Sequence, residues 1–386
     1  MATLNLMISE RRNKNCYAVM NKTLAIFLIH HVSKMVEKYD FRFIMVVLTA
    51  FGAISGILKC FTLSRERFWI LVFAQVFAGF SQVFTYVMKT RLVMIWFKST
   101  ELATATGIVQ ASYLVGDAAS FLLPLAFSSK NHNNLMNSFT NMSIGTAIFA
   151  TMAFLLVVVF FKEKPTLPAN HAERKRKENP KPYIWTFAKG RNFSLLVLHY
   201  GFLLSVFNNM IVVLNQIILS RIPDGHMILM VCGVAFVLSG VPAQFFGGMI
   251  LDKFKNHRLA SVLSGGITVI SFTGFAIALH YKSTTWMITW TVLYGIFANF
   301  TWIIGLDIAM EMMYPLPENR TLSWLTLSSK GFSVLSIYIT SILIEKISTI
   351  SALIFLQSVN LLNYIFLLSL KIQMNRSLSE LEHEDK

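Results

Sequence analysis

Long apolar stretches dominate this chain, and short polar segments separate them. Each of ten stretches approaches the ~20 residues that a helix needs to cross the ~30 Å hydrocarbon core of a bilayer. They cover residues 43–58, 68–88, 102–127, 140–161, 193–220, 227–251, 259–280, 286–314, 323–344 and 349–370. Polar segments this short leave no room for a separate soluble catalytic domain. The pattern therefore predicts an all-α polytopic membrane protein that works inside the bilayer.

Composition agrees with a membrane location and narrows the expected partners. Hydrophobic residues make up 55% of the 386 residues and charged residues only 14%, which is too little polar surface for a soluble domain of this length. The net charge is +15, but the basic residues are spread through the loops, so we expect the lipid bilayer and no nucleic acid as a partner. Cys16, Cys60 and Cys232 lie far apart, which indicates neither disulfides nor a metal site.

The largest polar interruption is a basic, proline-rich segment at 162–192. Its nine Lys and Arg residues place it on the cytoplasmic side by the positive-inside rule. It divides the chain into an N-terminal transmembrane bundle (1–161) and a C-terminal transmembrane bundle (193–371), which a short cytoplasmic tail (372–386) follows. We interpret the basic cluster at 174–177 as a topology determinant, with contact to anionic lipids as the alternative.

A weak internal repeat links the two halves, as expected of a transporter built from duplicated bundles. Gly248, Asp252 and Lys253 form the G-x-x-x-D-[RK] pattern of the major facilitator superfamily, on a turn between two predicted helices. Glu37 stands at the corresponding place in the first half, where the pattern is degraded. The offset between Glu37 and Asp252 is 215 residues.

A second pair of acidic residues repeats at almost the same spacing. Glu101 and Glu318 each precede an apolar stretch, and they are 217 residues apart. A carboxylate at this place can cap the following helix and pair with nearby arginines such as Arg91, which would latch one conformation of the bundles. Plain turn and capping chemistry without gating is the alternative.

Short motifs along the chain resemble one family of the major facilitator superfamily, the feline leukaemia virus subgroup C receptor-related transporters. The resemblance covers roughly residues 22–370, including Phe51-Gly52, Lys59-Cys60, Phe68-Trp69, Trp96-Phe97, Phe121 to Pro124, Phe161 to Pro165, Tyr200-Gly201, Leu214 to Gln216 and Gly305 to Glu311. It implies two helical bundles related by a pseudo-two-fold repeat. It also implies transport of a small molecule, either haem or choline and ethanolamine.

The N-terminal bundle departs from the twelve helices that the resemblance implies. Only Leu24 to Ile29 is strongly apolar before the first long stretch, so we expect the family's first helix to be missing and 10–11 spans to remain. If this short segment crosses the bilayer, the N-terminus lies outside; if it lies at the interface, the N-terminus lies inside. A shortened gene product or an incomplete gene model is the expected cause.

Ionisable residues inside apolar stretches are costly and should face a cavity or a partner. Asp307 and Glu311 are four residues apart and share one helix face. Lys330 lies in the middle of the next stretch, and we expect it to reach Asp307. The pair either fixes two helices or gates a substrate cavity. Asp117 has no evident partner in the sequence, and we interpret it as a cavity-facing or protonated acid.

The resemblance also indicates where a cation would bind. A quaternary ammonium favours an aromatic cage, for which Phe207 is retained and Asn208 follows it. Leu114 and Lys330 stand where the family has glutamines. Choline transport therefore requires Lys330 to be paired or turned away. The rest of the expected cavity consists of Asn215, Gln216 and Trp302.

Histidines and tryptophans do not form a cofactor site in the sequence. His132, His199, His226 and His280 show no ligand spacing for haem or a metal, so we expect no resident cofactor. We interpret most tryptophans as interfacial anchors. Trp302 is the exception, because it lies nearer the middle of its stretch.

The sequence therefore predicts a carrier that works by alternating access, in the plasma membrane or else in a mitochondrial or endoplasmic reticulum membrane. The alternative is a truncated, non-transporting paralogue that acts as a scaffold or regulator of a full-length carrier. No catalytic triad, phosphate loop or metal spacing indicates an enzyme, and no feature specifies an oligomeric state.

Overall fold

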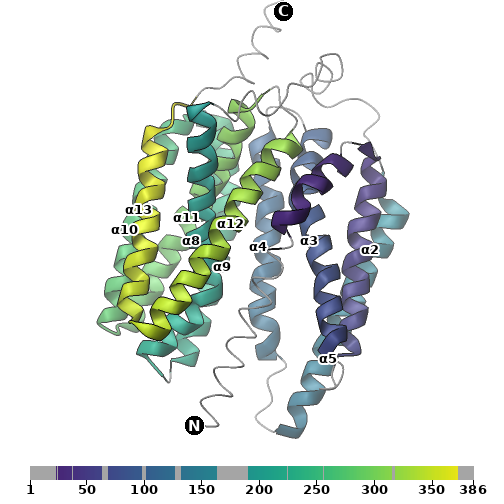
Figure 1. Cartoon of the computed structure of the whole chain (residues 1–386), viewed down its shortest axis with the longest axis horizontal. Coiled ribbons are helices and arrows are strands. Elements are labelled where there is room, and N and C mark those ends of the chain that lie inside the picture. Colours follow the sequence, from purple (N-terminus) through teal and green to yellow (C-terminus); the bar gives the residue numbers. More distant parts are fainter. Residues whose placement is uncertain are drawn as a thin grey trace, which may run out of the picture. The chain divides into compact units, whose positions relative to one another are not determined.

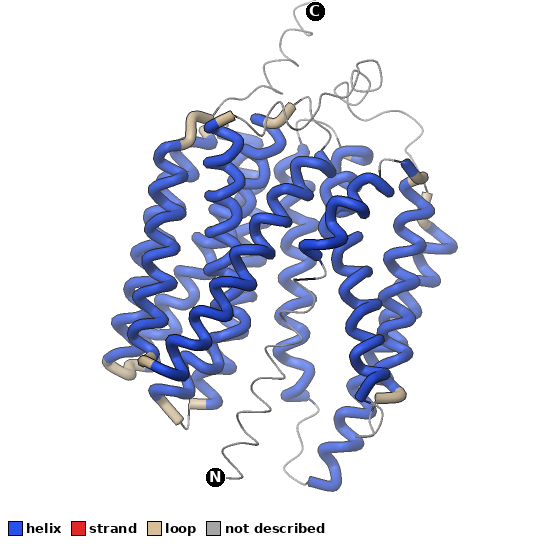
Figure 2. The backbone as a smooth tube through the Cα atoms, in the orientation of Figure 1, coloured by secondary structure: helices blue, strands red, loops and turns tan. Residues whose placement is uncertain are grey.

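The computed structural model describes residues 23, 25–36, 38–62, 68–97, 101–126, 132–162, 190–223, 225–254, 256–314 and 318–372. Within these ranges every regular element is a helix (Figure 2). The long helices are α2 (Phe41–Cys60), α3 (Phe68–Trp96), α4 (Leu102–Ala126), α5 (His132–Phe160), α8 (Arg191–Arg221), α9 (His226–Phe254), α10 (His257–His280), α11 (Thr284–Met312), α12 (Glu318–Lys346) and α13 (Thr349–Ser369).

Each predicted apolar stretch corresponds to one of these long helices, which confirms the all-α fold class. Among the described residues, nine helices are long and apolar enough to cross a membrane. The remaining long helix, α4, carries several of the polar side chains of the site below. A shorter apolar helix, Ala25–Val36, precedes α2 and coincides with the short segment whose crossing the sequence leaves open.

One compact unit comprises Met1–Met88 and Leu122–Glu163. In it, α2 packs along α5 at a close approach, where a Cβ added to Gly56 would lie 3.1 Å from the Cα of Ala147. The hydroxyl of Ser81 on α3 donates to the carbonyl of Leu48 on α2 (2.8 Å). The Phe51 ring packs against rings of α3, namely Phe77, Phe80 and Phe84.

The other compact unit comprises Lys89–Phe121 and Lys164–Lys386. Within it, α8 packs against α12 and α13, and α11 packs against α9 and α10 (Figure 1). Helices α8 and α11 are the most deeply buried of the candidate spans, so their side chains form most of the core. The sequence divides the chain near the same linker but assigns residues 89–121 to the first bundle, and its domain boundaries stay a prediction.

Glycine sets the spacing between α9 and α11. A Cβ added to Gly295 would lie 2.5 Å from the carbonyl oxygen of Phe236, closer than real contacts allow. We expect Gly295→Ala to push the two helices apart and to lower the free energy of unfolding by about 1–3 kcal/mol. Thermal unfolding of purified protein in detergent measures this loss.

A matched control comes from α12. A Cβ added to Gly331 meets nothing within 4 Å, so Gly331→Ala should leave stability unchanged or raise it slightly, because alanine favours helix. Equal thermal midpoints for the two variants would contradict the close packing of α9 on α11.

Candidate functional site

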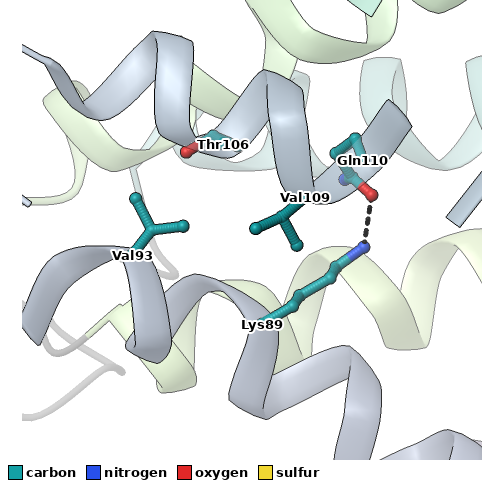
Figure 3. A pocket seen from close by; sticks show the side chains of 5 residues that line it. All are labelled: Lys89, Val93, Thr106, Val109 and Gln110. Carbon is teal, nitrogen blue, oxygen red and sulfur yellow. Dashed lines mark hydrogen bonds between the residues drawn. The ribbon is translucent and has the colours of Figure 1, made fainter. Parts of the chain in front are cut away.

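A buried lysine on α3 is the centre of the candidate site. The ammonium of Lys89 donates a hydrogen bond to the side-chain oxygen of Gln110 on α4 (3.0 Å). Together with Val93, Thr106 and Val109, these two residues line a small pocket (Figure 3). Helical spacing explains the lining, because Val93 lies one turn after Lys89, and Thr106 lies one turn before Gln110.

Aromatic rings surround the Lys89 ammonium. Its nitrogen lies 5.7 Å from the ring centroid of Trp302 and 6.0 Å from that of Tyr113. Trp302 is only 7% exposed, and its indole N–H donates to the hydroxyl of Tyr200 (2.9 Å). The Phe207 ring lies 5.6 Å from Trp302. These faces stabilise a cation by cation–π attraction.

Two further charged groups complete the site. Lys330 on α12 is 8% exposed and lies within electrostatic range of Lys89 and Asp117. Asp117 shares one face of α4 with Gln110 and Tyr113, because the three are spaced by three and four residues. We call this set the lysine cluster, and its members are Lys89, Gln110, Tyr113, Asp117, Trp302 and Lys330.

The expected pairing of Lys330 with Asp307 is wrong. Asp307 instead lies 2.7 Å from the ring nitrogen Nε2 of His257, the first residue of α10. Asp307 and Lys330 do not meet because they lie at different distances from the turn that joins their helices, each of which rises ~1.5 Å per residue. Asp307 is roughly 8 Å from the end of α11, whereas Lys330 is roughly 18 Å from the start of α12. The electrostatic partner that the sequence did not supply for Asp117 is Lys330.

The other expected cavity residues divide into two groups. Phe207 and Trp302 are buried and in contact. Asn208 donates to the backbone of its own helix, and the cross-helix bond is made by its neighbour Asn209, whose amide donates to Ser336 (2.7 Å). The remaining expected residues lie outside the lysine cluster: Asn215 is exposed, and Gln216 and Glu311 are half-buried.

The predicted gating residues lie at helix ends. The G-x-x-x-D-[RK] pattern lies in the last two turns of α9, just before the α9–α10 turn on which the sequence places it, with Gly248 buried and Lys253 exposed. Glu101 is exposed directly before α4, and Arg91 is half-buried on α3. Glu37 lies outside the described residues, as do the side chains of Asp252 in α9 and Glu318 at the start of α12. A gating role for this set stays a prediction.

Sequence reasoning missed Lys89, Gln110, Tyr113 and Tyr200. One signal was available for Lys89, because a lysine inside an apolar helix is costly and indicates function by default. Over the ranges that the structure describes, no three His, Cys, Asp or Glu side chains converge on one point, so we assign no metal to the site.

Comparison with known proteins shows the superfamily to which the chain belongs. The family model of the Major Facilitator Superfamily matches residues 23–335, and the chain belongs to this superfamily of multi-pass membrane proteins. Solved structures share the fold. The xylose–proton symporter XylE superimposes with a TM-score of 0.74 at 11% identity, over 94% of this chain and 88% of that one. The Escherichia coli fucose–proton symporter FucP gives 0.70 at 8% identity, over 96% and 94%.

Within the superfamily, similar proteins support the resemblance to the feline leukaemia virus subgroup C receptor-related transporters that the sequence indicates. Choline/ethanolamine transporter FLVCR1 of Mus musculus is 25% identical over 81% of this chain and 59% of its own length. An uncharacterized MFS-type transporter of Caenorhabditis elegans is 27% identical over 84% of this chain and 56% of its own length. The chain thus spans less than two thirds of the length of these relatives.

Proposed function

We propose that this protein is a carrier that moves a small polar metabolite across a membrane by alternating access, with the solute bound at the lysine cluster. The observation that carries the proposal is the buried hydrogen bond between Lys89 of α3 and Gln110 of α4, inside two long helices. Ionisable groups at this depth are expensive and are retained chiefly where they serve a solute or ion pathway.

Each part of the lysine cluster has a role in this proposal. Lys89 and Gln110 bind the polar part of the solute, while Trp302 and Tyr113 cover its apolar part. Asp117 holds Lys330 in place by charge attraction. At the helix ends, Asp252 and Glu101 stabilise one access state.

The relatives' names make choline and ethanolamine the first solutes to test, and the family resemblance adds haem. Leu114 and Lys330, which replace the family's glutamines, indicate that recognition differs in detail. The plasma membrane is the proposed location, with the basic linker at 162–192 in the cytoplasm.

Uptake by the full chain in proteoliposomes tests the proposal. We expect at least one labelled solute among choline, ethanolamine, small metabolites of similar size and haem to enter faster than into empty liposomes. Gln110→Leu should lower that uptake at least tenfold, because it removes the partner of Lys89. Lys346→Gln is the matched control, since Lys346 is exposed on α12. Folded protein that moves none of these solutes would contradict transport and favour a scaffolding or regulatory role.

A further inference from the structure

A histidine lies in the core that α8 forms with α11 and α13. His199 on α8 is 1% exposed, and its ring interacts with the backbone and the side chain of Asn363 on α13. Among the described residues, however, neither ring nitrogen of His199 has a hydrogen-bond partner of regular length and angle. A buried polar group without such a partner is costly, so the placement of this ring calls for a further partner.

Two asparagines on α13 have the same deficit as His199. Over the ranges that the structure describes, the side-chain oxygen Oδ1 of Asn363 and the amide nitrogen Nδ2 of Asn360 make no hydrogen bond. The two residues are buried and lie three positions apart, on one face of the helix. The set therefore contains an acceptor, a donor and an imidazole, which in its neutral form supplies one of each. A group that both donates and accepts matches this set, whereas an ion matches only half of it.

Gly305 on α11 leaves room beside the His199 ring. This glycine is buried, and the nearest atom to an added Cβ would be Nε2 of His199, at 3.6 Å. That distance is an ordinary van der Waals contact, so the space accepts one methyl-sized group. Gly295 in the same helix has no such room, because an added Cβ would lie 2.5 Å from the carbonyl oxygen of Phe236. A water molecule is no larger than a methyl group and fits the space at Gly305.

We infer that one ordered water molecule binds between Nε2 of His199, the side chain of Asn363 and the backbone of α11 at Gly305. Buried waters of this kind typically make about three hydrogen bonds to polar groups that otherwise lack partners, and they are costly to remove. This water joins α8 to α11 beside the direct hydrogen bond between Tyr200 and Trp302. The inference does not depend on which solute the protein carries.

Two substitutions of Gly305 test the inference by the order of their stabilities. Gly305→Ala places a methyl group where the water binds and leaves Nε2 of His199 without a partner. Gly305→Ser places a hydroxyl there, which can donate to an imidazole nitrogen or accept from it. We expect the serine variant of the full chain to unfold at least ~2 °C above the alanine variant, although alanine is the better helix former.

The same pair of substitutions at Gly331 is the matched control. An added Cβ there meets nothing within 4 Å, so Gly331→Ala should be at least as stable as Gly331→Ser, in the order of helix propensity. His199→Phe removes both ring nitrogens and retains a ring. In that background the advantage of serine at Gly305 should disappear. If His199→Phe does not fold, the stability order at Gly305 still decides.

A cryo-electron microscopy map of the full chain in lipid nanodiscs locates the water directly. We expect a density peak ~3 Å from Nε2 of His199 in the wild type and none in Gly305→Ala. Three results would overturn the inference. They are an alanine variant at least as stable as the serine variant at Gly305, a serine advantage that persists in His199→Phe, and a map that resolves other buried waters but shows no peak beside His199.

Discussion

Replacing Lys330 with glutamine is expected to lower the free energy of unfolding by about 3–5 kcal/mol, because it removes the buried charge that faces Asp117. Adding Asp117→Asn should recover most of this loss, since the uncompensated carboxylate is then gone. A double-mutant cycle on thermal unfolding in detergent measures the coupling between the two residues.

A second acidic residue provides the control for this cycle. Asp307 pairs with His257 rather than with Lys330, so Asp307→Asn should rescue nothing in the Lys330→Gln background. Rescue by Asp307→Asn and none by Asp117→Asn would mean that the structure assigns the charges on α11 and α12 to the wrong partners.

Truncating Trp302 to alanine is expected to cost about 3–5 kcal/mol of stability, as for other large buried aromatic side chains. The indole packs against Phe207, lies beside the Lys89 ammonium and donates to Tyr200. Trp302→Phe retains most of the packing but loses the hydrogen bond, so its cost should be about 1 kcal/mol. Chemical or thermal unfolding of the purified Trp302→Ala and Trp302→Phe variants separates the contribution of packing from that of the hydrogen bond.

The same helix offers an internal reference for this prediction. Trp286 lies near the start of α11 and is 60% exposed, as the sequence suggests for an interfacial anchor. Trp286→Ala should therefore change the free energy of unfolding of the detergent-solubilised protein little. A loss for Trp286→Ala as large as that for Trp302→Ala would contradict the buried placement of Trp302.

Most of the fold can be predicted from the sequence, because apolar runs of bilayer length are compatible with few structures other than membrane-spanning helices. One inaccurate boundary is also the most informative one. The predicted stretch 68–88 ends directly before Lys89, whereas α3 continues to Trp96. Lys89 therefore lies inside a helix, and the centre of the candidate site went unrecognised.

The charge partners could not be predicted, because pairing across helices depends on depth as well as on face. Asp307 and Lys330 are both ionisable residues in neighbouring helices, and only helix lengths place them at different depths. Trp302 was recognisable from its position near the middle of a stretch. Gln110 and Tyr113 gave no such signal, because their roles depend on Lys89.

Access to the pocket from each side of the membrane tests the carrier proposal most directly. Thr106 lines the pocket, so Thr106→Cys can be probed with an impermeant thiol reagent after Cys16, Cys60 and Cys232 are replaced. Thr268→Cys, at a buried position of α10, is the unreactive control. Alternating access predicts that Thr106→Cys reacts in both right-side-out and inside-out vesicles, and that the transported solute slows both reactions. Reaction in only one vesicle orientation, with or without solute, would contradict it.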